Sequence, residues 1–170
     1  MFNTNTQIIE RLGATDQLYL TGNSPELALE RGDLRLQLIA ASKMRQEKLY
    51  FLHEAIAILE SGRVEFEEMP QSLYTNLSLH LAKAYMVYFE LTQENKFATI
   101  TQQILKTLAY LNHADIYFFL AYACAAKQEP ALTQHWLKKY SKTEGFDSKL
   151  LSEHPTFTAF HSQIWFQTLL

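Results

Sequence analysis

The chain has 170 residues, of which 48% are hydrophobic and 19% are charged. This balance excludes a disordered chain and allows a buried core in a single domain over residues 1–170. Only 5 glycines and 4 prolines punctuate the sequence, so we expect long helices with short connections rather than many short strands. The net charge of -3 lacks the basic footprint of a nucleic-acid-binding protein.

The single cysteine, Cys124, excludes an intramolecular disulfide framework and is compatible with a reducing compartment. Residues 1–12 lack the basic head and the unbroken apolar core of a signal peptide. No run of about 18 apolar residues is present, which argues against a membrane-spanning segment. We therefore expect a cytoplasmic protein without a membrane partner.

The first residues predict short helices whose ends are set by glycines. Apolar residues at helical spacing predict a helix over residues 6–12 that Gly13 ends. Ser24 predicts the cap of a second helix, with Pro25 in its first position. This helix either continues through Gly32 or breaks there. We favour the break, because a glycine inside a helix costs up to about 1 kcal/mol relative to alanine.

Longer helices follow, separated by short polar breaks. Apolar residues at spacings of three and four predict helices over residues 33–45, 47–60, 70–91, 96–111, 115–126 and 130–142. The breaks fall at residues 61–69, 92–95, 112–113 and 127–129. We therefore divide the domain into N-terminal helices (1–32), helix pairs (33–62, 70–111 and 114–143) and a tail (145–170).

The helices over residues 115–126 and 130–142 can bury one face against each other as an antiparallel pair. The facing residues are Leu120, Ala121, Cys124, Trp136, Leu137 and Tyr140. The first helix is apolar nearly all round between Tyr117 and Tyr122, so a second layer must cover it. We expect the C-terminal tail to do so, with an exposed binding patch as the alternative.

Small residues recur at a spacing of about 40 residues, at Ala41, Ala82 and Ala121. A small residue in the first helix of each pair lets a partner helix approach closely. This period favours a stacked array of helix pairs. The alternative is an irregular helical bundle in which the alanines coincide by chance.

The last pair resembles a tetratricopeptide repeat (TPR). The matching positions are Tyr117, Leu120, Ala121, Cys124, Thr133, Leu137 and Tyr140. Cys124 stands where the family usually has Tyr, and Tyr140 where it usually has Ala. The middle pair matches only through Leu81, Ala82 and Tyr85, and the resemblance is strongest over residues 115–170. It implies an all-α, TPR-like solenoid, a right-handed superhelix of stacked antiparallel helix pairs with a C-terminal capping helical tail.

Such a resemblance also implies a groove lined by the first helix of each pair, which binds another protein or a peptide. The groove positions fall on Arg35, Leu38, Ser42, Arg45, Asn76, Leu79, Lys83, Met86, Asp115, Phe118 and Tyr122. Cations, apolar anchors and aromatic rings suit an acidic or amphipathic peptide. For each apolar residue in the set, a place in the core is the simpler interpretation.

No motif for catalysis, phosphate binding or zinc binding occurs. Only His154 and His161 among the histidines could share a face, and Cys124 lies in an apolar run where it packs rather than reacts. We therefore expect no enzyme activity, no cofactor and no metal site. The function implied by the resemblance is that of a non-catalytic adaptor.

A second hypothesis is a bacterial immunity or antitoxin-like protein that neutralises a toxin or effector by binding it. Its footprint would be an acidic patch of Glu60, Glu65, Glu67 and Glu68, which complements a basic nuclease. Homodimerisation through the apolar residues 165–170 is a further alternative.

Overall fold

A computed structural model describes residues 5–170 of the chain, and within that range every regular element is a helix. The all-α prediction is therefore confirmed. The chain forms two compact units, Met1–Thr92 and Gln93–Leu170. The expected pair over residues 70–111 has one helix in each unit, and that pairing stays a prediction.

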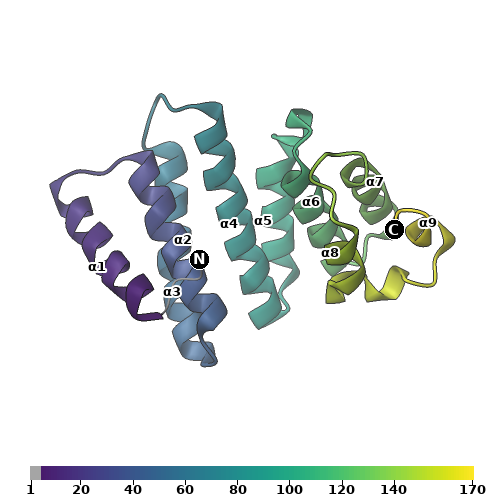
Figure 1. The fold of residues 1–170 in the computed structure, drawn as a ribbon, viewed down its shortest axis with the longest axis horizontal. Coiled ribbons are helices and arrows are strands. Elements are labelled where there is room, and N and C mark those ends of the chain that lie inside the picture. The colour runs from purple at the N-terminus through teal and green to yellow at the C-terminus, as the bar shows by residue number, and fades with distance from the viewer. Residues whose placement is uncertain (1–4) are drawn as a thin grey trace. The chain divides into compact units, whose positions relative to one another are not determined.

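Residues 5–92, the described part of the first unit, form four helices. They are α1 (Asn5–Thr21), α2 (Pro25–Ala41), α3 (Arg45–Val64) and α4 (Gln71–Thr92). α1 packs on α2, α2 packs on α3, and α4 packs on both α2 and α3 (Figure 1). The predicted cap of α2 is present, because the Ser24 hydroxyl accepts a hydrogen bond of 3.0 Å from the Leu27 N–H.

Two predicted breaks do not occur, and a third begins later than predicted, because α3 runs through Gly62 to Val64. α1 runs through Gly13 to Thr21, and α2 runs through Gly32 to Ala41. At Gly32 the missing side chain has a packing role, since a Cβ there would lie 2.5 Å from Leu59 Cδ2. Close contact between α2 and α3 explains this glycine better than a helix end. Ala41 is the exposed last residue of α2, so the expected small contact residue in mid-helix is wrong at this position.

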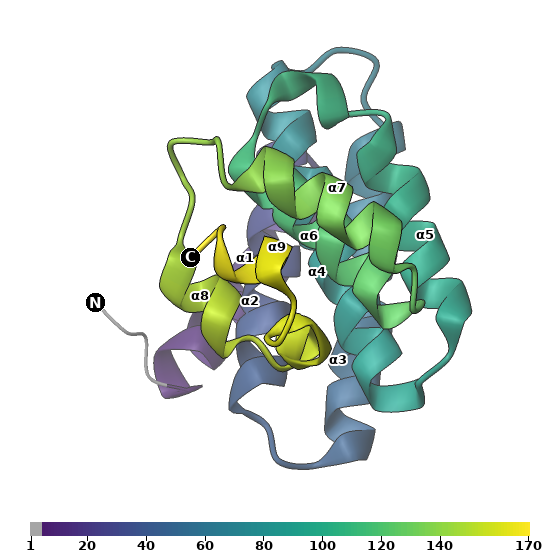
Figure 2. The ribbon, with the colours of Figure 1, turned by 90° about the vertical axis from the view of Figure 1, so that its right-hand side faces the viewer.

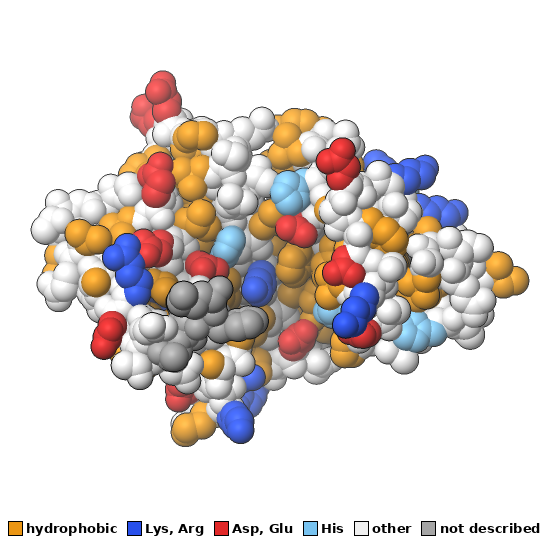
Figure 3. Space-filling view, viewed as in Figure 1, with side chains coloured by type: hydrophobic (Ala, Val, Ile, Leu, Met, Phe, Trp, Pro, Cys, Tyr) orange, Lys and Arg blue, Asp and Glu red, His pale blue; other side chains and the backbone are white. Residues whose placement is uncertain are grey.

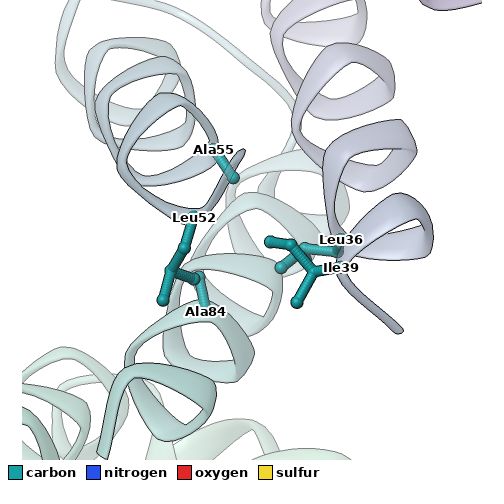
Figure 4. Close-up of a cluster of buried hydrophobic side chains, with 5 residues drawn as sticks. All are labelled: Leu36, Ile39, Leu52, Ala55 and Ala84. Atoms are coloured by element: carbon teal, nitrogen blue, oxygen red, sulfur yellow. The ribbon is translucent and has the colours of Figure 1, made fainter. Parts of the chain in front are cut away.

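Part of the core of the first unit lies where α2, α3 and α4 meet (Figure 4). The side chains are those of Leu36, Ile39, Leu52, Ala55 and Ala84. The alanines let the helix backbones approach while the larger residues fill the space between them. This packing fixes which faces of α2 and α4 remain exposed.

The second unit contains shorter helices. They are α5 (Asn95–Lys106), η1 (Ala109–Leu111), α6 (Ala114–Ala126), α7 (Pro130–Tyr140), α8 (Ser148–Glu153), η2 (Pro155–Phe160) and α9 (Ile164–Gln167). α6 packs on α5, α7 and η2, and α8 packs on η2 (Figure 2). The helix expected over residues 96–111 ends at Lys106, where the Thr107 hydroxyl bonds back to the Ile104 carbonyl at 3.0 Å.

The tail covers α6, as expected from its apolar surface. The ring centroids of Phe118 and Phe157 are 5.8 Å apart, and those of Tyr122 and His154 are 4.6 Å apart. The Phe157 side chain, from η2, is fully buried. The six facing residues predicted for α6 and α7 are also buried. These contacts confirm the antiparallel pair and its cover.

The predicted polar breaks are confirmed at Gln93, Asn112 and Gln128. These residues have φ values of 58°, 54° and 59° and are the only described non-glycine residues with positive φ. A single left-handed residue after a helix turns the chain away from the helix axis. The sequence therefore makes these turns without glycine.

Candidate functional site

Polar residues gather on the surface of α2 and α4, and we call them the α2–α4 polar face: Asp33, Gln37, Asn76, His80 and Lys83. His80 Nε2 lies 3.1 Å from Asp33 Oδ1, and His80 Nδ1 lies 2.7 Å from the Asn76 carbonyl oxygen. Gln37 donates from Nε2 to Asp33 Oδ2 at 2.7 Å. Both partners of the His80 ring are oxygen acceptors, one on α2 and one on α4 itself.

Charge is balanced within this face. The hydrogen bond from His80 lowers the pKa of Asp33 below its usual value, and this outweighs burial, which acts in the opposite direction. Gln37 and the positive charge of Lys83 lower that pKa further. Acidic, basic and histidine side chains lie close together over α2 and α4 in Figure 3. The face therefore presents a fixed pattern of both signs.

The predicted groove residues of α2 do not belong to the α2–α4 polar face. Arg35 is only 3% exposed and Leu38 is buried with Ile8 and Leu34, so both point into the first unit. Residues two positions apart on a helix differ by about 200°. The structure thus places the exposed face of α2 at Asp33 and Gln37 rather than at Arg35 and Leu38.

Ser42 and Arg45 lie at helix ends. The Ser42 N–H bonds to the Leu38 carbonyl at 2.9 Å and closes the end of α2. Arg45 donates from Nη2 to the Leu91 carbonyl at 2.8 Å, which links the start of α3 to the end of α4. Arg45 therefore has a structural contact that the sequence did not indicate.

The predicted groove residues of α4 divide evenly. Asn76 and Lys83 are exposed, whereas Leu79 and Met86 are buried. The repeat-based projection thus included Asn76 and Lys83 of the α2–α4 polar face and missed His80, although the three residues recur at helical spacing along α4.

In the second unit, Asp115 is exposed at the start of α6, and Phe118 and Tyr122 are buried. Their rings contact His154 of the tail, with centroids 5.5 Å and 4.6 Å away. These two aromatic residues therefore belong to the core, which was the simpler interpretation of the sequence.

A partly buried ion-pair network joins α1, α2 and α3 in the first unit. Asp16 of α1 accepts from Arg31 Nε at 2.8 Å and from Arg35 Nη2 at 2.9 Å. Arg35 also donates from Nε to Glu54 of α3 at 2.8 Å and from Nη1 to the Arg31 carbonyl at 3.2 Å. Burial alone would raise the pKa of Asp16, but the hydrogen bonds from the two arginines lower it.

The four glutamates of the expected acidic patch are all exposed. Glu60 accepts a hydrogen bond from the Tyr85 hydroxyl, and Glu65 accepts one of 3.1 Å from Asn23 Nδ2. Within residues 5–170, Glu67 and Glu68 have no ion-pair or hydrogen-bond partner. Their negative charge is therefore available to a ligand.

Cys124 is fully buried in α6. Its sulfur accepts a hydrogen bond of 3.1 Å from Gln102 Nε2. Burial raises the pKa of the thiol, and the hydrogen bond from Gln102 only partly offsets this. A buried, protonated thiol packs as a small apolar group.

Within the described residues, no three side chains of His, Cys, Asp or Glu are grouped so that they could hold a metal ion. The same part of the chain has no helix that combines the length and the apolar character needed to cross a membrane. Comparisons with protein-family models, with curated proteins and with solved structures gave no match for this chain.

Proposed function

We propose that this chain is a non-catalytic protein-binding module that uses the α2–α4 polar face. The observation that supports the proposal best is the 3.1 Å contact between His80 and Asp33, which joins the exposed surfaces of two helices. Gln37 and Asn76 hold this pair from either side. A surface whose side chains are fixed before binding loses less conformational entropy when a partner docks.

The charges of the face select the partner. Lys83 is exposed and offers three donors. Asp33 is already engaged by His80 and Gln37. Lys83 therefore carries the accessible charge of the face, which favours a partner segment with acidic residues.

The test is a capture experiment with tagged protein in lysate of its own host, followed by mass spectrometry. Lys83→Glu reverses the free charge of the face, and Lys43→Glu makes the same charge change at an exposed residue between α2 and α3. We expect one stoichiometric partner with wild type and with Lys43→Glu, and about tenfold less of it with Lys83→Glu. Equal recovery with both variants would contradict the proposal.

The second candidate is an immunity-like protein that caps a basic toxin or effector. It is favoured by Glu67 and Glu68, which are exposed and unpaired within the described residues. They follow α3 in the same loop as Glu65. Negative charge in a loop attracts a basic partner and accelerates association. Added salt shortens the distance over which this attraction acts.

This second candidate has its own test. Replacing Glu60, Glu65, Glu67 and Glu68 with Gln should slow association with a basic partner and weaken its salt dependence. The control is the same replacement at four other exposed glutamates, Glu10, Glu26, Glu47 and Glu144. If both quadruple variants associate at the wild-type rate, the acidic residues do not steer a partner.

A further inference from the structure

A cavity of about 500 Å³ opens in the first unit among α1, α2 and α3. Its lining includes Tyr19, Asn23, Arg31, Ile58, Val64 and Glu65. The volume lies in the range typical of small-molecule sites. This cavity is separate from the α2–α4 polar face, since Arg31 and Asp33 are two positions apart on α2 and diverge by about 200°.

Arg31 is the unusual residue of this cavity, because it is only 9% exposed and yet has unused donors. Its Nε donates to Asp16 at 2.8 Å, and its guanidinium lies 4.1 Å from the centroid of the Tyr19 ring. The two terminal nitrogens have no hydrogen-bond partner within residues 5–170. They lie at the tip of a side chain that lines the cavity.

Arg35, one turn further along α2, provides the comparison. All three of its side-chain nitrogens donate hydrogen bonds, to Asp16, Glu54 and the Arg31 carbonyl. The two arginines share one carboxylate and are similarly buried. Of the two arginines, only Arg31 therefore keeps an edge of its guanidinium free within residues 5–170, and this edge is available to an acceptor in the cavity.

The chemistry of the cavity defines its occupant. The guanidinium edge presents parallel N–H groups whose geometry matches a carboxylate. Ile58 and Val64 supply apolar walls, and Tyr19 fixes the plane of the guanidinium by stacking. Glu65, held by Asn23 at 3.1 Å, adds negative charge to the lining and disfavours a second anionic group. The occupant thus carries one carboxylate on an apolar body.

We propose that this cavity binds an apolar monocarboxylate, with the free edge of the Arg31 guanidinium as the partner of the carboxylate. The carboxylate comes either from a free organic acid or from the C-terminus of a peptide that ends in an apolar residue. The inference does not depend on the α2–α4 polar face and stands whether or not that face binds a protein.

The experiment is a calorimetric titration of the full chain with two pairs of probes. The first pair is 3-phenylpropionate and its amide, and the second is N-acetyl-Ala-Leu with a free carboxylate and the corresponding amide. We expect at least one acid to bind with a Kd in the millimolar range or below, and its amide to bind at least about tenfold more weakly. The tighter of the two acids identifies the source of the carboxylate.

Two variants locate the binding. Arg31→Lys keeps the positive charge beside Asp16 but loses the parallel N–H groups of the guanidinium edge. We expect this variant to weaken binding by about tenfold. Val64→Glu adds negative charge to a wall residue that is 80% exposed, so it spares the fold and should also weaken binding. Ile9→Glu is the control, because Ile9 is 59% exposed and lies ten residues, about 15 Å, before Tyr19 on α1.

The outcomes are distinct. Weaker binding with Arg31→Lys and Val64→Glu, together with wild-type binding by Ile9→Glu, supports the proposal. If Arg31→Lys does not fold, the comparison of Val64→Glu with Ile9→Glu decides alone. Equal binding of acids and amides, or no binding of either acid at about 10 mM, would overturn the proposal.

Discussion

Asp16 shows how one residue can organise the interior of the first unit. Its carboxylate pairs with Arg31 and with Arg35, whose side chains are 11% and 4% exposed. Two buried cations depend on this single anion and on Glu54. Removing one member of such a network leaves charge uncompensated in the protein interior, which destabilises more than the intact network stabilises.

We predict that Asp16→Asn lowers the free energy of unfolding by about 2 kcal/mol at pH 7, a value reduced because the Asp16 side chain is 34% exposed. The folded-state pKa of Asp16 is lowered. Its stabilising contribution is therefore complete above the unfolded-state pKa of about 3.9 and is lost as pH falls through the folded-state pKa. Urea unfolding at several pH values checks this.

The difference between wild type and Asp16→Asn should shrink as the pH falls below about 4. Glu10→Gln is the control, since Glu10 is an exposed carboxylate on the same helix. A stability difference that is absent at pH 7, or that grows in acid, would contradict the assigned role of Asp16.

Two glycines inside helices provide a second prediction at the residue scale. A Cβ at Gly13 would meet no atom within 4 Å, whereas one at Gly32 would lie 2.5 Å from Leu59 Cδ2. Gly13→Ala should stabilise the protein by up to about 1 kcal/mol through helix propensity. Gly32→Ala gains the same propensity but should lose about 1–3 kcal/mol by overpacking.

Thermal unfolding of the two alanine variants measures this contrast directly. A higher Tm for Gly13→Ala and a lower Tm for Gly32→Ala are expected. Equal shifts of the two variants would mean that α2 and α3 do not approach as closely as described.

At the scale of elements, the tail is the cover of α6. Phe157 of η2 is fully buried and contacts Phe118, with ring centroids 5.8 Å apart. We predict that Phe157→Ala lowers the free energy of unfolding by about 3–5 kcal/mol. Phe160→Ala, in the same short helix at a half-buried position, should cost less than half as much. Chemical denaturation that gives equal losses would show that the tail does not pack on α6 through Phe157.

The break between α6 and α7 gives another prediction at this scale. Gln128 is exposed and has a φ of 59°. The left-handed conformation costs a residue with a Cβ about 1–2 kcal/mol, and glycine avoids that cost. Gln128→Gly should therefore raise the free energy of unfolding by about 0.5–1 kcal/mol. A lower value in urea unfolding would indicate that the Gln128 side chain has a stabilising contact.

At the scale of the whole molecule, local signals in the sequence predicted most of the helix boundaries among the described residues. Ser24 with Pro25 marks the start of α2, and polar breaks mark the ends of α4 and α6. The helix break predicted at Gly32 was wrong, because the glycine there allows close contact with Leu59, 27 positions away, and does not end a helix. Such a contact becomes visible only when α2 and α3 are placed together.

The candidate sites were harder to predict, because each depends on residues far apart in the sequence. Asp33 and His80 are separated by 47 positions, and Arg35 is buried only because Asp16 and Glu54 arrive from two other helices. From sequence alone, a charged residue is more simply assigned to the surface. The polar spacing along α4 was the one signal for the α2–α4 polar face that could be read locally.

Site-specific photo-crosslinking in cells of the natural host tests the central claim most directly. A benzophenone amino acid is placed at position 83 on the α2–α4 polar face and at position 43 between α2 and α3. A third is placed at position 67 in the acidic loop, the segment after α3 that carries Glu65, Glu67 and Glu68. The account predicts a crosslinked protein partner from position 83 and none from position 43. Crosslinks from position 67 alone would favour the acidic loop as the binding surface, and crosslinks from position 43 alone would contradict both assignments.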